Sequence, residues 1–207
     1  MEPKNTIFLV LLLSTILQYS SATPNRSELD RFIVTSCQTT RYPLLCVHTL
    51  SAYATMIRHK NDQDLAQTAL TISLSRARSV AIFVAKLTKE YVLFFCTFKR
   101  REYLAIKDCI EVLGNSVDRL SQSVKELGRA GHAVAGEDFM WKMSNVQTWV
   151  SAALTDETTC LDGFSGRAME GKVKKLIRLK VVHVAQVTSN ALALVNHFAE
   201  KRSAKIP

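Results

Sequence analysis

Residues 106–127 read IKDCIEVLGNSVDRLSQSVKEL, and this stretch decides the fold class. Its apolar residues recur at steps of three or four from end to end: Ile106, Ile110, Leu113, Val117, Leu120, Val124 and Leu127. That period places them along one face of an α-helix. Most positions between them are polar, so the stretch is predicted to be a long amphipathic helix with one buried face.

Three further segments have the same spacing. Their stripes are Leu65, Ala69, Ile72, Val80, Phe83 and Leu87, interrupted by Arg76; Phe139, Met143, Val146, Val150 and Ala153; and Ile177, Val181, Val184, Thr188, Ala191, Val195 and Phe198. Residues 99–101 and two groups of glycines separate the segments, and Gly128 is predicted to end the second helix. Because short links make sequential helices antiparallel, residues 61–207 are predicted to form an up-down-up-down four-helix bundle.

The segment before the bundle predicts a smaller unit. Residues 27–37 and 43–59 read as two shorter helices on either side of Arg41-Tyr42-Pro43, which makes residues 23–60 an N-terminal helical hairpin. The chain has only 7 Gly and 4 Pro, too few for a turn-rich β fold. The predicted fold class is therefore all-α.

Residues 1–22 have the features of a secretory signal peptide. One Lys precedes an apolar run from Ile7 to Leu17, and Ser20-Ser21-Ala22 supplies the small residues of a cleavage site. The run is too short to cross a bilayer, which takes roughly 20 residues. No later segment is expected to be apolar over a sufficient length, so residues 23–207 are predicted to be a secreted, soluble domain without a transmembrane segment.

Export makes disulfides possible for five cysteines, Cys37, Cys46, Cys96, Cys109 and Cys160. An odd number leaves one thiol over, and Cys37 and Cys46 are close enough in sequence to staple a small hairpin. No C-x-x-C or H-x-x-x-H pair is present, so no metal site is expected. Asn25-Arg26-Ser27 is a sequon that makes Asn25 a glycosylation acceptor.

Catalytic motifs are missing from the sequence. The five histidines are scattered, and residues 163–166 lack the spacing of a nucleophile elbow. No polar cluster is expected in the core of the bundle. The chain is therefore predicted to be no enzyme and to use no cofactor.

Residues 145–164, NVQTWVSAALTDETTCLDGF, carry the most specific signal. They resemble the helix of plant pectin methylesterase inhibitors that ends in W-x-S-A-A-L-T-x-x-x-T-C-x-D-x-F, and every fixed position is present. Residues 105–113, AIKDCIEVL, resemble the family's A-L-x-D-C-x-E-x-Y, with Ile106 and Leu113 as departures. The R-Y-P between Cys37 and Cys46 also matches, so the resemblance covers the whole mature chain.

The resemblance implies both cross-links and a function. The pairs would be Cys37–Cys46 and Cys109–Cys160, with Cys96 left as a buried free thiol. The protein would be a secreted inhibitor in the plant cell wall that blocks the pectin-binding cleft of pectin methylesterase without a covalent step. The implied contact residues are Asn115, Asp118, Thr155, Thr159 and Asp162, although the family has an acidic residue where Asn115 stands.

Other functions stay open. The sister branch of the family inhibits acid invertases, but its Pro-Lys-Phe contact motif is absent here, which favours the esterase. The formal net charge of +9 and the basic stretch over residues 172–180 also fit a bundle that binds anionic pectin or lipid and inhibits nothing. Alternatively, these Lys and Arg residues only solvate a helix face. Nucleic acid is a poor partner for an exported chain, and an esterase pro-region would need a catalytic domain after Pro207.

Overall fold

A computed structural model describes residues 26–94, 100–132, 136–165 and 171–204. The predicted signal peptide over residues 1–22, the sequon at Asn25 and the thiol of Cys96 lie outside these ranges. These three features stay predictions, as does the division into units at residue 60.

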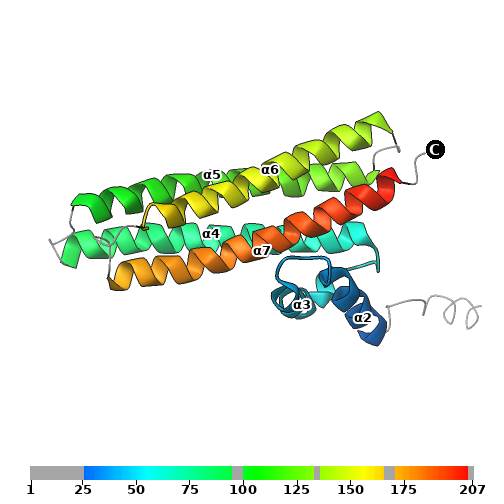
Figure 1. The fold of residues 1–207 in the computed structure, drawn as a ribbon, viewed down its shortest axis with the longest axis horizontal. Helices are drawn as coiled ribbons and strands as arrows, with labels where there is room; N and C mark the ends of the chain where they lie inside the picture. Colours follow the sequence, from blue (N-terminus) through cyan, green and yellow to red (C-terminus); the bar gives the residue numbers. More distant parts are fainter. Residues whose placement is uncertain (1–25, 95–99, 133–135, 166–170, 205–207) are drawn as a thin grey trace, which may run out of the picture.

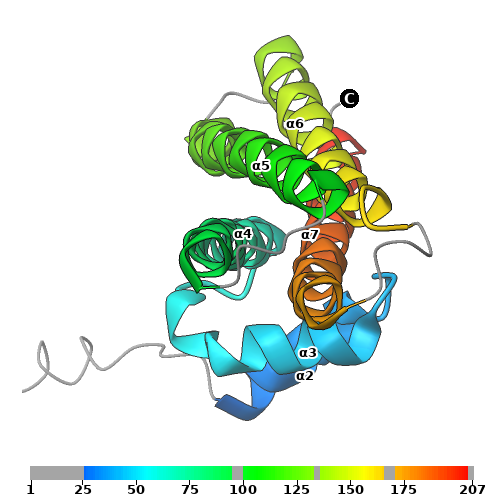
Figure 2. The ribbon, with the colours of Figure 1, turned by 90° about the vertical axis from the view of Figure 1, so that its left-hand side faces the viewer.

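Four long helices form the body of the molecule. They are α4 (Asp62–Phe94), α5 (Arg100–His132), α6 (Glu137–Asp162) and α7 (Lys172–Ser203). Sequential helices run antiparallel, and α7 packs against both α6 and α4 (Figures 1 and 2). The predicted all-α, up-down-up-down four-helix bundle is confirmed, and so is the helical hairpin before it.

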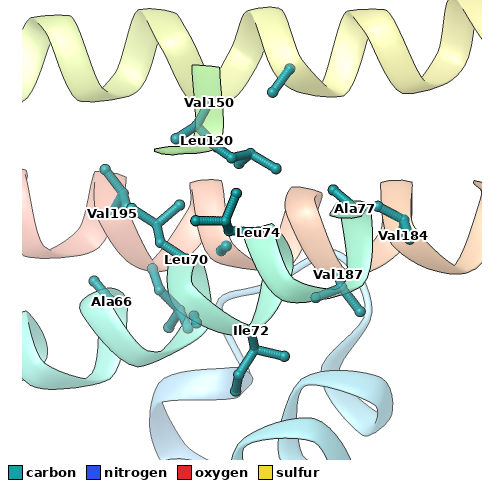
Figure 3. Packing of buried hydrophobic residues seen from close by; sticks show 14 of the residues in the cluster. Ala66, Leu70, Ile72, Leu74, Ala77, Leu120, Val150, Val184, Val187 and Val195 are labelled. Atoms are coloured by element: carbon teal, nitrogen blue, oxygen red, sulfur yellow. The ribbon is translucent and has the colours of Figure 1, made fainter. Parts of the chain in front are cut away.

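The stripes read from the sequence form the core of the bundle. Ile106, Leu113, Leu120 and Leu127 of α5 are completely buried. Figure 3 shows side chains of α4, α5, α6 and α7 converging in this core. Arg76 interrupts the apolar stripe but does not end α4, which spans 33 residues in all. The Arg76 side chain is partly exposed.

Two helix boundaries differ from the prediction. Arg100 and Arg101 belong to the first turn of α5, where the carboxylate of Glu102 offsets their unfavourable interaction with the positive end of the helix dipole. Gly128 lies inside α5, which ends only at His132. The helix continues because its apolar stripe still has a partner: Leu127 and Ala130 are fully buried.

The N-terminal hairpin consists of α2 (Arg26–Cys37), α3 (Pro43–Ala52) and the short 3-10 helix η1 (Ala54–Met56). The second helix is shorter than the predicted range 43–59, because the backbone leaves the helical conformation at Tyr53. Asn190 of α7 holds the hairpin by two reciprocal bonds. Its Oδ1 accepts from the N–H of Tyr42 and its Nδ2 donates to the carbonyl of Tyr42, each at 3.0 Å.

The structure contains the two disulfides that the resemblance implies. Cys37–Cys46 joins the end of α2 to α3, and Cys109–Cys160 joins α5 to α6 with a Cα–Cα distance of 4.4 Å. Each bond cross-links two helices that also pack side by side. The second bond therefore fixes the register of α5 against α6.

By length and composition α4 would pass as a membrane-spanning helix, contrary to the expectation from the sequence. The apolar window lies within Asp62–Lys89 and has a mean hydropathy of 1.2. Half of this window is buried inside the bundle. Leu65, Leu70 and Val84 of this helix are almost completely buried, so its apolar residues serve the core.

Candidate functional site

The five contact residues expected from the sequence lie on one pair of helices. Asn115 and Asp118 are on α5, Thr155, Thr159 and Asp162 are on α6, and all five side chains are exposed. On each helix they follow steps of three or four, opposite the buried stripe. We call these residues, together with Arg119 and Asp156 between them, the α5–α6 face.

An ion pair crosses this face. The guanidinium of Arg119 on α5 contacts the carboxylate of Asp156 on α6 and donates a bond of 3.4 Å to the carbonyl of Ala152. The Arg119 side chain is 39% exposed and that of Asp156 is 12% exposed, so the guanidinium is open to a partner while the carboxylate is not. Together with Cys109–Cys160, this pair cross-links the two helices of the face.

The threonines of the face use their hydroxyl hydrogens within their own helix. Thr155 Oγ1 donates to the carbonyl of Ser151 at 3.1 Å, and Thr159 Oγ1 donates to the carbonyl of Thr155 at 2.8 Å. Their remaining lone pairs can only accept hydrogen bonds. Because the carboxylates of Asp118 and Asp162 are also acceptors, the α5–α6 face is suited to a partner that presents N–H donors.

A polar cluster lies in the bundle centre beneath this face, contrary to expectation. Glu157 of α6 is fully buried, and its Oε1 accepts bonds from Ser116 of α5 at 2.9 Å and Thr188 of α7 at 3.0 Å. Thr188 also shares a hydrogen bond of 2.7 Å with Ser73 of α4. We call these four residues, one from each bundle helix, the central polar cluster.

Burial controls the protonation of Glu157. It raises the pKa of this carboxyl from 4.5 to about 7, because a charged carboxylate loses its hydration in the core. The hydroxyls of Ser116 and Thr188 lower the pKa by a smaller amount, and the nearby carboxylate of Asp156 raises it. Glu157 Oε2 has no hydrogen-bond partner among the described residues, which also favours the neutral acid.

Sequence reasoning missed both the ion pair and the central polar cluster. Glu157 follows Val146, Val150 and Ala153 at helical spacing, so an acidic residue on an apolar stripe was visible in the sequence. Arg119 and Asp156 each stand next to a residue that was predicted. Their pairing depends on the register of α5 against α6, which is a tertiary feature.

Two cavities lined by described residues lie away from the α5–α6 face. A small cavity lies between α3, α4 and α7 and is lined by Cys46, Leu50 and Val187, and a larger one lies at the start of α4 beside Phe198. No three His, Cys, Asp or Glu side chains in the described part of the chain are grouped so that they could hold a metal ion. The α5–α6 face is an exposed helical surface.

Fold and face together describe a disulfide-bonded helical bundle with an exposed, acceptor-rich surface on α5 and α6. The family model "Plant invertase/pectin methylesterase inhibitor" matches residues 31–194. The chain belongs to this family. Both fold and sequence motifs thus agree with the resemblance seen in residues 145–164.

Several relatives are similar over nearly the whole chain. The chain is 85% identical to pectinesterase inhibitor 9 of Arabidopsis thaliana, with 100% of both chains covered. It is 50% identical to a 21 kDa protein of Daucus carota and 43% identical to pectinesterase inhibitor 11 of Arabidopsis thaliana, and these matches cover 95–96% of each chain.

A solved structure supports the fold. The crystal structure of a mutant form of a pectin methylesterase inhibitor from Arabidopsis covers 79% of this chain and 95% of its own, with 20% identity and a TM-score of 0.61.

Proposed function

We propose that the protein is a secreted inhibitor of pectin methylesterase that acts in the plant cell wall and covers the pectin-binding cleft of the enzyme with its α5–α6 face. The complex is non-covalent, and the chain has no catalytic activity of its own. Asn115, Asp118, Thr155, Thr159 and Asp162 are the proposed contact residues.

One observation carries the proposal: exposed polar residues of α5 and α6 stand on two neighbouring helices that a disulfide and an ion pair cross-link. A rigid surface loses little conformational entropy on binding, so more of the contact energy is retained as affinity. The full-length similarity to a protein named pectinesterase inhibitor 9 supports the choice of target.

The chemistry of the face supports recognition of donor groups around a cleft. Asp118, Asp162 and the two threonines offer acceptors, and Arg119 offers a guanidinium that Asp156 holds in place. Asn115 supplies both a donor and an acceptor without charge. The resemblance implies an acidic residue where Asn115 stands, so a complex of this chain would lack the charge-assisted bond that a carboxylate could make there.

Parallel titration tests the proposal. The oxidised protein is added at increasing dose to a plant pectin methylesterase and to an acid invertase, and release of methanol and of glucose is measured. We expect stoichiometric loss of esterase activity, unchanged invertase activity, and no turnover by the protein alone. Inhibition of the invertase alone would assign the chain to the other branch, and two fully active enzymes at micromolar dose would refute an inhibitory role.

A further inference from the structure

In one half of the layer formed by α4 and α7, every charged side chain that the structure describes is positive, whereas the side chain of Glu90 lies outside that description. From residue 65 to residue 89 of α4, and from residue 172 to residue 199 of α7, the sequence contains no Asp or Glu. The cations in the adjoining halves of these helices, which we call the basic layer, are Arg76, Arg78, Lys86 and Lys89 of α4 and Lys174, Lys175, Arg178 and Lys180 of α7.

Cross-helix contacts bring these two sets of cations together. The Lys180 ammonium of α7 lies 4.8 Å from the ring centroid of Phe83 on α4, and the Arg76 guanidinium of α4 contacts the imidazole of His183 on α7. The end of α4 and the start of α7 also lie side by side in Figure 1. These contacts show that α4 and α7 pack together within the basic layer, so its cations belong to two neighbouring helices.

The hairpin and the basic layer lie at opposite ends of the same side of the bundle. α2 and α3 pack at the other end of the α4–α7 layer, where Asn190 holds Tyr42 (Figure 1). Beyond the hairpin, the side chains of Arg78, Lys86, Lys175 and Arg178 are exposed. The α5–α6 face is formed by the other two helices, which Figure 2 shows on the opposite side of the bundle.

We propose that the basic layer binds de-esterified pectin, a polyuronate, and that it does so while the α5–α6 face holds the esterase. This inference rests on the proposed function, because hydrolysis of pectin methyl esters produces such carboxylates. A row of carboxylates on one polymer matches a surface with many cations and no described carboxylate. The inhibitor would then concentrate where the esterase has already acted.

An anionic membrane is a poorer fit to the same charges. A helix that adsorbs to a membrane turns its apolar face to the lipid. In α7 that face is used inside the bundle, where Ile177, Val181 and Val184 are at most 1% exposed. The described basic half exposes only three large apolar side chains, Ile82 on α4 and the neighbouring Leu176 and Leu179 on α7, in place of a whole apolar face.

The test compares two charge-matched double variants of the oxidised protein. Lys175→Glu/Arg178→Glu alters the basic layer, and Arg31→Glu/Arg58→Glu makes the same charge change at exposed positions of the hairpin and the loop after it. Binding is measured by co-sedimentation with polygalacturonate, with fully methyl-esterified pectin and with phosphatidylserine vesicles, and esterase inhibition is measured in parallel. Circular dichroism confirms that both variants are folded.

The expected result is binding to polygalacturonate only, weakened at least tenfold by Lys175→Glu/Arg178→Glu, with the control close to wild type and inhibition retained by both. Molar salt should release the polymer, because it shortens the screening length from about 10 Å to about 3 Å. Equal weakening by the control, equal binding to esterified pectin, or binding to vesicles alone would overturn the proposal. Loss of inhibition in the basic-layer variant would overturn it as well, whereas failure of the wild type to inhibit would refute only the proposed function.

Discussion

Ser116 Oγ donates a hydrogen bond of 2.9 Å to Oε1 of Glu157 and thereby connects α5 to α6 in the centre of the bundle. Thr188 and Ser73 extend this connection to α7 and α4. Because Glu157 is the only ionisable member of the central polar cluster, its charge state is coupled to the stability of all four helices.

Replacing Glu157 by Gln should change how stability depends on pH. The folded state raises the pKa of Glu157 to about 7, above its ordinary value of 4.5, so the folded state binds this proton more tightly than the unfolded state. The contribution of Glu157 to the free energy of unfolding is complete below pH 4.5. It decreases as pH rises to 7, by up to about 3 kcal/mol. Glu157→Gln should remove this decrease, which urea denaturation at pH 4.5, 6 and 8 measures.

The matched control is Glu111→Gln, which changes an exposed carboxyl on α5. This variant should keep the pH dependence of the wild type. A Glu157→Gln protein that still loses stability between pH 4.5 and 7 would place the responsible proton elsewhere.

Asp162→Arg should weaken inhibition of the esterase without unfolding the protein. The exposed carboxylate ends α6 on the α5–α6 face, and loss of a charge-assisted bond costs about 1.5–3 kcal/mol, or at least tenfold in affinity. An exposed substitution changes stability by about 0.5 kcal/mol or less. Glu200→Arg near the end of α7 is the control with the same charge change, and equal inhibition constants for the two variants would remove Asp162 from the site.

Substitution of two neighbouring threonines distinguishes a role in esterase binding from a role in helix stability. Thr158 and Thr159 are both exposed, and each hydroxyl donates to a carbonyl of α6, but only Thr159 is a predicted contact residue. Thr159→Val should weaken inhibition several-fold by removing an acceptor, whereas Thr158→Val should not. Isothermal titration against the esterase measures both, and the reverse order would show that the contact surface is rotated around α6.

Asn190→Ala should loosen the hairpin and leave the bundle folded. The variant removes both bonds to the backbone of Tyr42, for an expected loss of about 1–3 kcal/mol. Hydrogen exchange should then accelerate in α2 and α3. Asn196→Ala is the control, because Asn196 bonds to Gln147 of α6 at 3.0 Å and not to the hairpin. Unchanged exchange in α3 would show that apolar packing alone holds the hairpin.

The two disulfides should differ in their contribution to stability. Cys109–Cys160 closes a loop with a sequence separation of 51, and Cys37–Cys46 one of 9. In the chain-entropy model these loops correspond to about 4 and about 2.5 kcal/mol. Paired Cys→Ala variants should follow this order in thermal denaturation, and the variant without Cys109–Cys160 should also lose esterase inhibition. Full inhibition by that variant would show that the ion pair of Arg119 suffices to hold the face.

The sequence predicted the helices because their apolar stripes are long and regular. In α5 the stripe from Ile106 to Leu127 keeps helical spacing at every step, so the alternation of a β-strand does not compete with it. Each leucine of this stripe is buried. The resemblance of the residues around Cys160 to the family motif predicted the cross-link to Cys109, which periodicity alone does not predict. The contact residues remain predictions, since exposure is necessary for a contact but does not identify one.

Features that depend on how helices meet were not predictable. Gly128 is of the residue type that often ends a helix, yet α5 continues past it because tertiary packing outweighs local propensity. Gly131 shows the same point: a Cβ at this position would lie 1.6 Å from Nε2 of Gln63 on α4, so the glycine permits a close approach. The shared hydrogen bonds of Glu157 likewise require the relative positions of three helices.

Only two pairs of helices in the described part of the chain depend on oxidising surroundings for a covalent cross-link. One bond lies within the α2–α3 pair and the other within the α5–α6 pair, so neither joins α4 or α7 to the rest of the fold. Exposure to a reductant would act first on the hairpin and on the proposed esterase-binding surface. The proposed polyuronate-binding side, held by packing and hydrogen bonds without a disulfide, would respond instead to heat and ionic strength, so the two proposed activities of one small protein would fail under different conditions.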